Sequence, residues 1–246
     1  MDMDNIELRL LIGEPVPLEG VGEIHSPLVK DIVRLGQSTY NEYLSYILVD
    51  KDKISVQEDE RDTLTTFNVI LSLCIHDPHF HRIYFNALKF FFKEEVFLGH
   101  NDKEYFFYLG DYSDCRYITK DNIEIMQAII RIANQVKIKD EKEEQYNPAN
   151  EEAARIIAEM LERRKKKPKP KPTTNLHSII SGLACKSNNI SYFNVGDLTI
   201  YQLYDNFHRL EVIENYHYTL VGIYSGNVNG KEINFNKIHW TKIIEQ

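Results

Sequence analysis

The chain has 246 residues and a formal net charge of −8, a balance that argues against a dedicated nucleic-acid binder, because such proteins usually carry a basic surface. Hydrophobic residues make up 43% of the chain, which is enough to bury the core of one large domain or two small ones. The three cysteines are far apart and form no CxxC pair, which argues against a disulfide framework or a zinc site and favours a reducing, cytoplasmic setting.

The first residues, "MDMDNIELRL", are acidic and lack the basic flank of a signal peptide. No apolar run approaches the roughly 20 residues of a membrane span, so no membrane partner is expected. Between residues 6 and 26, short apolar runs alternate with Pro and Gly. This pattern predicts extended or irregular chain with a small hairpin.

The following segment, "SPLVKDIVRLGQSTYNEYLSYIL", changes to a helical period. Ser26 is placed to cap a helix, Pro27 suits its first position, and Gly36 predicts a break before a second helix. Residues 63–99 predict two further helices on either side of Asp77-Pro78, and "EYFFYLGDYSDCRYIT" predicts a strand and a turn.

The segment "TKDNIEIMQAIIRIANQV" predicts a helix capped by Thr119. Its apolar residues recur at helical spacing and define one predicted core face, formed by Ile123, Met126, Ile129, Ile130 and Ala133.

The segment 163–172, "RRKKKPKPKP", ends a predicted helix that begins near residue 150. Its prolines stop that helix and favour an extended linker. Residues 1–162 carry 31 acidic and 17 basic groups, a net −14, so the positive charge is confined to this segment. We interpret it as a solvated linker, with a salt-dependent nucleic-acid arm as the alternative. Its basic residues are Arg163, Arg164, Lys165, Lys166, Lys167, Lys169 and Lys171.

Beyond the linker, "NLHSIISGLACKS" predicts a short helix, and "NVGDLTIYQLYDNFHRL" predicts another capped by Asp197. Periodicity leaves both helix and strand open for residues 216–224. Large aromatic residues are dense here, and a small module cannot bury all of them, which indicates a partner-binding surface. Its candidate residues are Tyr201, Tyr204, Phe207, Leu210, Tyr216, Tyr218, Tyr224 and Trp240.

Together these elements predict a mainly α fold with a small N-terminal β element, an α+β arrangement. We expect a mainly helical N-terminal domain over residues 1–162, a basic Lys/Pro linker over 163–174, and a smaller aromatic-rich helical module over 175–246.

Catalytic and cofactor motifs are not found in the sequence. The cluster "HDPHFH" brings together His76, His79 and His81, which could gather a divalent ion. However, His79 and His81 point in different directions on one helix, and Asp77-Pro78 suits a helix junction. Neither a phosphate-binding glycine loop nor a GxSxG nucleophile is present. We therefore expect no enzyme activity and no cofactor.

Two segments resemble a known family. The stretch "EIHSPLVKDIVRLGQSTYNEYLSYIL" contains the pattern P-x-V-x-D-I-x-x-L-G, and "FNVGDLTIYQLYDNFHRLEVIENYHYTLVGIYSG" lies near the other end. Both are similar to tail assembly chaperones of phages that infect Gram-positive bacteria. The resemblance covers residues 6–50 and 175–245.

This resemblance implies a non-catalytic role in the cytoplasm of a bacterial host cell. Such chaperones coat the long, apolar tape measure protein before the tail tube polymerises around it, and they leave as the tube grows. The implied partners are the tape measure protein or other phage tail proteins, and self-association is left open. The alternatives are a structural tail or baseplate component and a nucleic-acid-associated protein that uses the basic linker.

Overall fold

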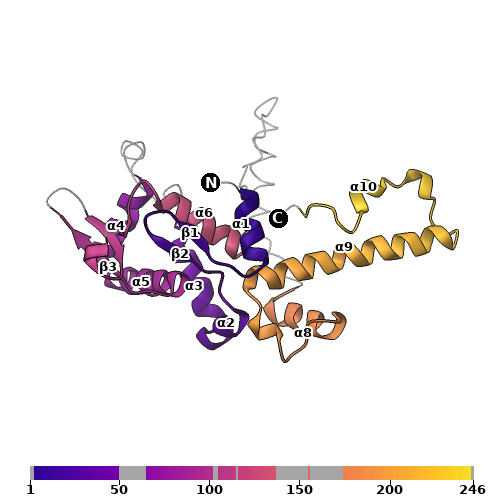
Figure 1. The fold of residues 1–246 in the computed structure, drawn as a ribbon, viewed down its shortest axis with the longest axis horizontal. Helices are drawn as coiled ribbons and strands as arrows, with labels where there is room; N and C mark the ends of the chain where they lie inside the picture. Colours follow the sequence, from indigo (N-terminus) through magenta and orange to yellow (C-terminus); the bar gives the residue numbers. More distant parts are fainter. Residues whose placement is uncertain are drawn as a thin grey trace.

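The computed structural model describes residues 3–49, 65–101, 105–114, 116–136, 155 and 174–244. Within these residues the fold is mainly α with small β elements, which confirms the predicted fold class. The helices and two small sheets form a body from which one long helix projects (Figure 1). The seven basic residues of the predicted linker lie outside the described residues, and so does the predicted helix over 150–167 apart from Arg155.

The chain begins with helix α1 (Met3–Leu11), where extended or irregular chain was predicted. Ile6 and Leu10 are buried, but Leu8, Leu11 and Ile12 are exposed, so apolar residues surround the helix and hide its period. The predicted hairpin follows. Strands β1 (Val16–Leu18) and β2 (Gly22–Ile24) pair antiparallel, with Val16 opposite Ile24.

Helices α2 (Val29–Leu35) and α3 (Gln37–Ile47) confirm the predicted pair and its break. Gly36 between them has a φ of 92°, a conformation that favours glycine. The predicted start of α2 was wrong. Leu28 holds the cap position without a side-chain hydrogen bond, while Ser26 and Pro27 bond to distant parts of the chain.

Helices α4 (Thr66–His76) and α5 (Pro78–Phe92) meet at Asp77-Pro78 as predicted. The Asp77 carboxylate accepts hydrogen bonds from the backbone N–H groups of His79 (2.8 Å) and Phe80 (3.2 Å). The second of these helices ends earlier than predicted, because Lys93 adopts the left-handed conformation, with a φ of 57°.

A three-stranded antiparallel sheet follows, in the order β3 (Val96–His100), β4 (Tyr105–Leu109) and β5 (Tyr117–Ile118). Its first strand was not predicted, because "KEEVFLGH" continues an apolar helical run without a turn signal. The short 3-10 helix η3 (Tyr112–Asp114) connects the last two strands.

Helix α6 (Ile123–Ala133) buries all five residues of its predicted core face. Asn122 occupies the cap position, so the prediction of Thr119 as the cap was wrong. The Thr119 hydroxyl accepts from the Asp121 N–H at 3.3 Å, in the turn before the helix. This helix packs with α1, α4, α5, both hairpin strands and the three-stranded sheet around the larger of two cores.

A second core joins an N-terminal part of the chain, residues 29–40, to a C-terminal part, residues 176–203. Helix α8 (Leu176–Lys186), the 3-10 helix η4 (Val195–Asp197) and the start of helix α9 (Ile200–Tyr224) pack against α2 and α3. The buried residues of this core are Val29, Ile32, Tyr40, Leu176, Ile179, Leu183, Ile190, Val195, Ile200 and Leu203. The predicted modules therefore share a core, and residues 216–224 are helical. The boundary at 163–174 stays a prediction.

Two tyrosine hydroxyls are buried in different ways. The Tyr40 hydroxyl donates to the Asn134 side-chain oxygen at 2.7 Å, whereas the Tyr84 hydroxyl has no hydrogen-bond partner within the described residues. Burial raises the pKa of both phenols, so both stay protonated at neutral pH.

These two side chains form a matched pair of substitutions. We expect Tyr40→Phe to lower the free energy of unfolding by about 1–2 kcal/mol, because it leaves a buried amide without its partner. Tyr84→Phe should leave stability unchanged or raise it by up to about 1 kcal/mol, because it removes an unsatisfied hydroxyl. Urea denaturation of both variants measures the difference, and an equal loss in both would contradict the assignment.

Candidate functional site: a projecting helical arm

The most unusual feature of the fold is the arm, which we define as residues 205–244. It consists of the rest of α9, the 3-10 helix η5 (Gly230–Glu232), helix α10 (Phe235–Ile238) and the chain between them. The 25 residues of α9 span about 38 Å, and the helix leaves the body while the C-terminal segment runs back beside it (Figure 1).

The start of α9 is fixed by a capping box. The Thr199 hydroxyl accepts from the Gln202 N–H at 3.1 Å, and the Gln202 side-chain oxygen accepts from the Thr199 N–H at 3.0 Å. Asp197, which was predicted as the cap, lies in η4 and forms an ion pair with Lys30 at 2.7 Å. The cap is therefore two residues later than predicted.

Backbone pairing ties this start to the N-terminal part of the chain. The Val29 N–H donates to the Leu198 carbonyl at 2.9 Å, and the Ile200 N–H donates to the Pro27 carbonyl at 2.8 Å. These bonds join segments about 170 residues apart in sequence, and Leu28 and Thr199 form an antiparallel bridge between them.

Three side chains complete this junction, one of them from α9 itself. The buried Ser26 hydroxyl donates to the Ala133 carbonyl at 3.0 Å and accepts a hydrogen bond from the Tyr201 N–H at 3.4 Å. Gln135 donates to the Tyr201 carbonyl at 3.3 Å, and Gln202 donates to the carbonyl of Leu11 at 3.0 Å. The first turn of α9 is therefore held by the end of α1, the segment before α2, and the end of α6.

The next two turns of α9 lie partly against α8. Phe207 and Leu210 pack at the edge of the second core, and Lys186 at the end of α8 bonds Glu214 at 2.5 Å. That bond raises the pKa of Lys186, but the pair is exposed and contributes little to stability. Burial raises the pKa of the Asp205 carboxyl, and Arg209 partly offsets this effect.

A different side of α9 is covered by the C-terminal segment. Arg209 donates to the carbonyls of Trp240 and Lys242, both at 2.9 Å. The Tyr216 ring lies 5.3 Å from the His239 ring, and Gly222 lies so close to Val228 that a Cβ would meet its side chain at 2.8 Å. The returning chain thus covers one side of the helix.

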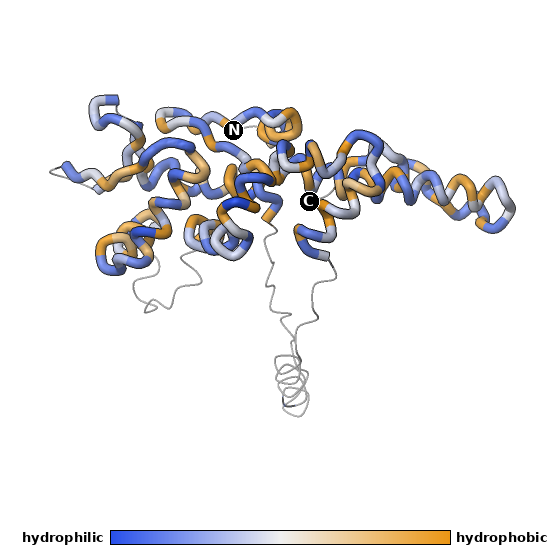
Figure 2. Tube along the Cα trace, turned by 90° about the horizontal axis from the view of Figure 1, so that it is seen from below, coloured by the Kyte–Doolittle hydropathy of each residue, from blue (hydrophilic) through white to orange (hydrophobic). Residues whose placement is uncertain are grey.

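Beyond α8, the side of α9 that carries Glu214 presents an exposed apolar stripe. Tyr218, Val221 and Tyr224 are 62%, 49% and 84% exposed, and their spacing of three residues places them on one face of the helix. From Tyr204 to Ile244 every side chain keeps part of its surface exposed, and hydrophobic residues recur along the whole arm (Figure 2). The returning segment adds four exposed apolar residues: Val228, Phe235, Trp240 and Ile243.

The eight residues predicted to bind a partner fall into three groups. Tyr201 is buried and holds the base of the helix. Intermediate exposure is found for Tyr204, Phe207, Leu210 and Tyr216. Tyr218 and Tyr224 are exposed on one face of α9, and Trp240 is exposed on the returning chain.

Sequence reasoning missed five exposed apolar residues of the arm: Ile213, Val221, Val228, Phe235 and Ile243. Four of them are aliphatic and were overlooked because the candidates were chosen mainly for aromatic side chains. The helical phase of residues 216–224, had it been known, would have placed Val221 between Tyr218 and Tyr224 on the same face.

The histidine cluster is dispersed by the fold. His76 Nδ1 lies 2.9 Å from the Ser72 carbonyl, His79 Nδ1 lies 3.3 Å from the Tyr46 hydroxyl, and His81 Nδ1 lies 3.1 Å from the Cys74 carbonyl. No group of His, Cys, Asp or Glu within the described residues is arranged to hold a metal ion. Within the same part of the chain, no helix is both long and apolar enough to span a membrane.

Comparison with known proteins gives one match. Residues 165–245, a third of the chain, match the family model described as the YomV second domain, a phage-associated name. The matched residues include α8, α9 and the whole arm. No curated protein and no solved structure matches the chain.

The junction at the base of the arm leads to a stability prediction. Ser26→Ala removes a donor and an acceptor from buried backbone groups, so we expect a loss of about 1–3 kcal/mol in the free energy of unfolding. Ser45→Ala is the matched control, because the Ser45 hydroxyl bonds the Glu42 carbonyl on the exposed surface. Thermal denaturation should show little change for the control, and equal effects of the two substitutions would contradict the importance of the junction.

Proposed function

We propose that this protein is a non-catalytic, protein-binding factor of phage tail assembly, which acts as a chaperone for the tape measure protein in the cytoplasm of the bacterial host. The observation that carries the proposal is the arm, which is anchored at its base and presents an uncovered apolar stripe at its end.

The physical argument starts from the low burial of the arm. A single helix with one irregular returning segment buries too little apolar surface to be stable alone, and isolated helices are marginal in water. Each square ångström of apolar surface removed from water contributes roughly 25 cal/mol. Tyr218, Val221 and Tyr224 would therefore gain most from a partner that covers them, and aromatic anchors of this kind dominate many protein interfaces.

The choice of partner is supported by sequence similarity. The two segments that resemble tail assembly chaperones contain the junction residues and α9, and the match to the YomV second domain covers the arm. A long apolar helical client is the kind of partner that an uncovered aromatic stripe suits.

The proposal is tested by producing this chain together with the tape measure protein encoded in the same genome. We expect the two proteins to co-purify and the soluble yield of the tape measure protein to rise. The double variant Tyr218→Ser, Tyr224→Ser should weaken the complex about 30-fold or more, because it removes two aromatic anchors.

The matched control is the double variant Phe97→Ser, Tyr105→Ser. These two residues are 44% and 42% exposed on the three-stranded sheet, far along the chain from the arm. Absence of co-purification, or an equal effect of both double variants, would refute the proposal. Mass spectrometry of purified particles adds an independent check, since stoichiometric amounts of this chain in the virion would indicate a structural tail component.

A further inference from the structure

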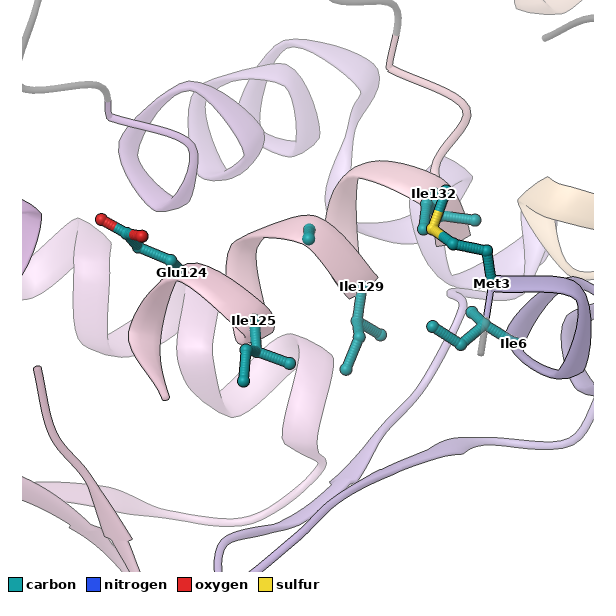
Figure 3. A pocket seen from close by; sticks show the side chains of 7 residues that line it. Met3, Ile6, Glu124, Ile125, Ile129 and Ile132 are labelled. Carbon is teal, nitrogen blue, oxygen red and sulfur yellow. The ribbon is translucent and has the colours of Figure 1, made fainter. Parts of the chain in front are cut away.

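Apolar surface of the described residues is also found outside the exposed stripe of α9. One such surface is a groove between α1 and α6, which isoleucines of α6 line together with Met3 and Ile6 of α1 (Figure 3). Another lies on α9 itself, where the chain's own C-terminal segment covers it. We propose that this segment, residues 233–244, is an autoinhibitory strap, which keeps a second binding face of α9 closed until the client protein displaces it.

The face of α9 beneath the strap, which we call the covered face, is apolar along about three turns. It is formed by Val212, Tyr216, Leu220 and Ile223, whose spacings of four, four and three residues place them on one side of the helix. All four side chains are only partly exposed. Tyr224 follows Leu220 by four residues, so the covered face adjoins the exposed stripe.

The strap is held by main-chain hydrogen bonds and a ring contact rather than by deep burial. The Lys242 N–H donates to the His239 carbonyl at 2.9 Å, which closes a turn. This turn directs the carbonyls of Trp240 and Lys242 at one nitrogen of Arg209, at 2.9 Å each. The His239 ring lies 5.3 Å from the Tyr216 ring. None of the strap residues, all of which the structure describes, is fully buried.

The strap is placed so that it can leave α9 without disturbing the body of the protein. Residues 225–229, which follow the helix, are all exposed, and Gly226 among them has a φ of 76°. The residues that form the two cores include none from the strap. Release of the strap therefore removes no core contact, and the base of α9 stays anchored by its capping box.

The covered face offers a client the same kinds of contact that it offers the strap. The Arg209 guanidinium binds main-chain carbonyls, which any protein chain supplies in a turn or at the end of a helix. The other side chains of the face are aliphatic or aromatic and suit an apolar client helix. A client that displaces the strap covers both faces of α9, whereas the closed arm offers it only the exposed stripe. The identity of this client rests on the proposed function.

The strap acts by lowering the fraction of chains that are open. A ligand of the covered face binds with an apparent Kd equal to its intrinsic Kd divided by that fraction, so about 10 to 100 closed chains for each open one weaken binding about 10- to 100-fold. Since a short connector gives an effective concentration in the mM range, the same segment supplied as a free peptide should bind an open chain with a Kd of about 10–100 µM.

A fluorescein-labelled peptide of residues 233–244 is the probe, so this part of the test needs no client. Thr241→Pro opens the strap in the full chain. It removes the N–H that donates to Nδ1 of His239 at 3.2 Å, and it restricts the backbone of Trp240, whose carbonyl binds Arg209. Measured by fluorescence anisotropy, the peptide should bind this variant at least about tenfold more tightly than the unchanged chain.

A second opening variant and a control at the same position make the result independent of one substitution. His239→Ala removes the ring that lies on Tyr216 and should also strengthen peptide binding. Thr241→Ser keeps the hydroxyl and the N–H, so it should bind the peptide like the unchanged chain. Circular dichroism checks that each variant keeps the helix content of the unchanged chain.

The site itself is tested in the opened chain. Arg209→Gln added to Thr241→Pro should remove the gain in peptide binding, because the peptide carbonyls then lose their donor. Lys186→Gln in the same background is the matched control, since Lys186 pairs with Glu214 on the α8 side of the helix. Equal peptide binding by the unchanged and both opened chains, or a gain that survives Arg209→Gln, would overturn the strap.

The tape measure protein then tests the client separately. We expect Thr241→Pro to strengthen its complex with this chain about threefold or more, because the covered face becomes available. Equal strength of the complexes with the unchanged and the opened chain would overturn the autoinhibitory role. A tape measure protein that binds neither chain would refute the proposed function, whereas the strap is decided by the peptide alone.

Discussion

The fold depends on a short stretch of backbone pairing between residues 26–29 and 198–201. Two backbone hydrogen bonds of 2.8 and 2.9 Å join the entry to α2 with the entry to α9, and the Ser26 hydroxyl links this junction to the end of α6. Contacts so distant in sequence must overcome a large loop-closure entropy. This entropy cost is offset by burial of the second core, which α2, α3 and α8 form around the junction.

This arrangement divides α9 into two parts with different surroundings. Its first turn is buried and bonded to three other parts of the chain, whereas Tyr218, Val221 and Tyr224 in its last turns are exposed. A helix held rigidly at one end presents its free end in a defined direction, which lowers the entropy cost of binding a partner there. Helix α9 therefore contains both the anchored first turn and the exposed stripe, and the match to the YomV second domain covers the whole helix.

Local signals predicted much of this fold, but the long-range features were not accessible from the sequence. Asp77-Pro78, Gly36 and the apolar period of α6 act through their immediate neighbours, so the helices they define were predicted correctly. Serine is a common helix cap, but the Ser26 hydroxyl instead makes tertiary hydrogen bonds with the backbones of Ala133 and Tyr201. Helix α1 and strand β3 were missed because apolar residues on several sides hide the period. Which side chains of the arm are exposed depends on where the returning chain packs, and the spacing of residues in the sequence does not reveal this.

Hydrogen–deuterium exchange along α9 tests the central claim, that the helix is fixed at its base and uncovered at its end. In the chain alone, backbone amides of residues 203–207 should exchange at least about 100-fold more slowly than those of residues 217–224, because only the base is buried. Addition of the tape measure protein should slow the exchange of residues 217–224 selectively. Uniform protection along the whole helix, or no change in its last turns when the partner is present, would contradict the account.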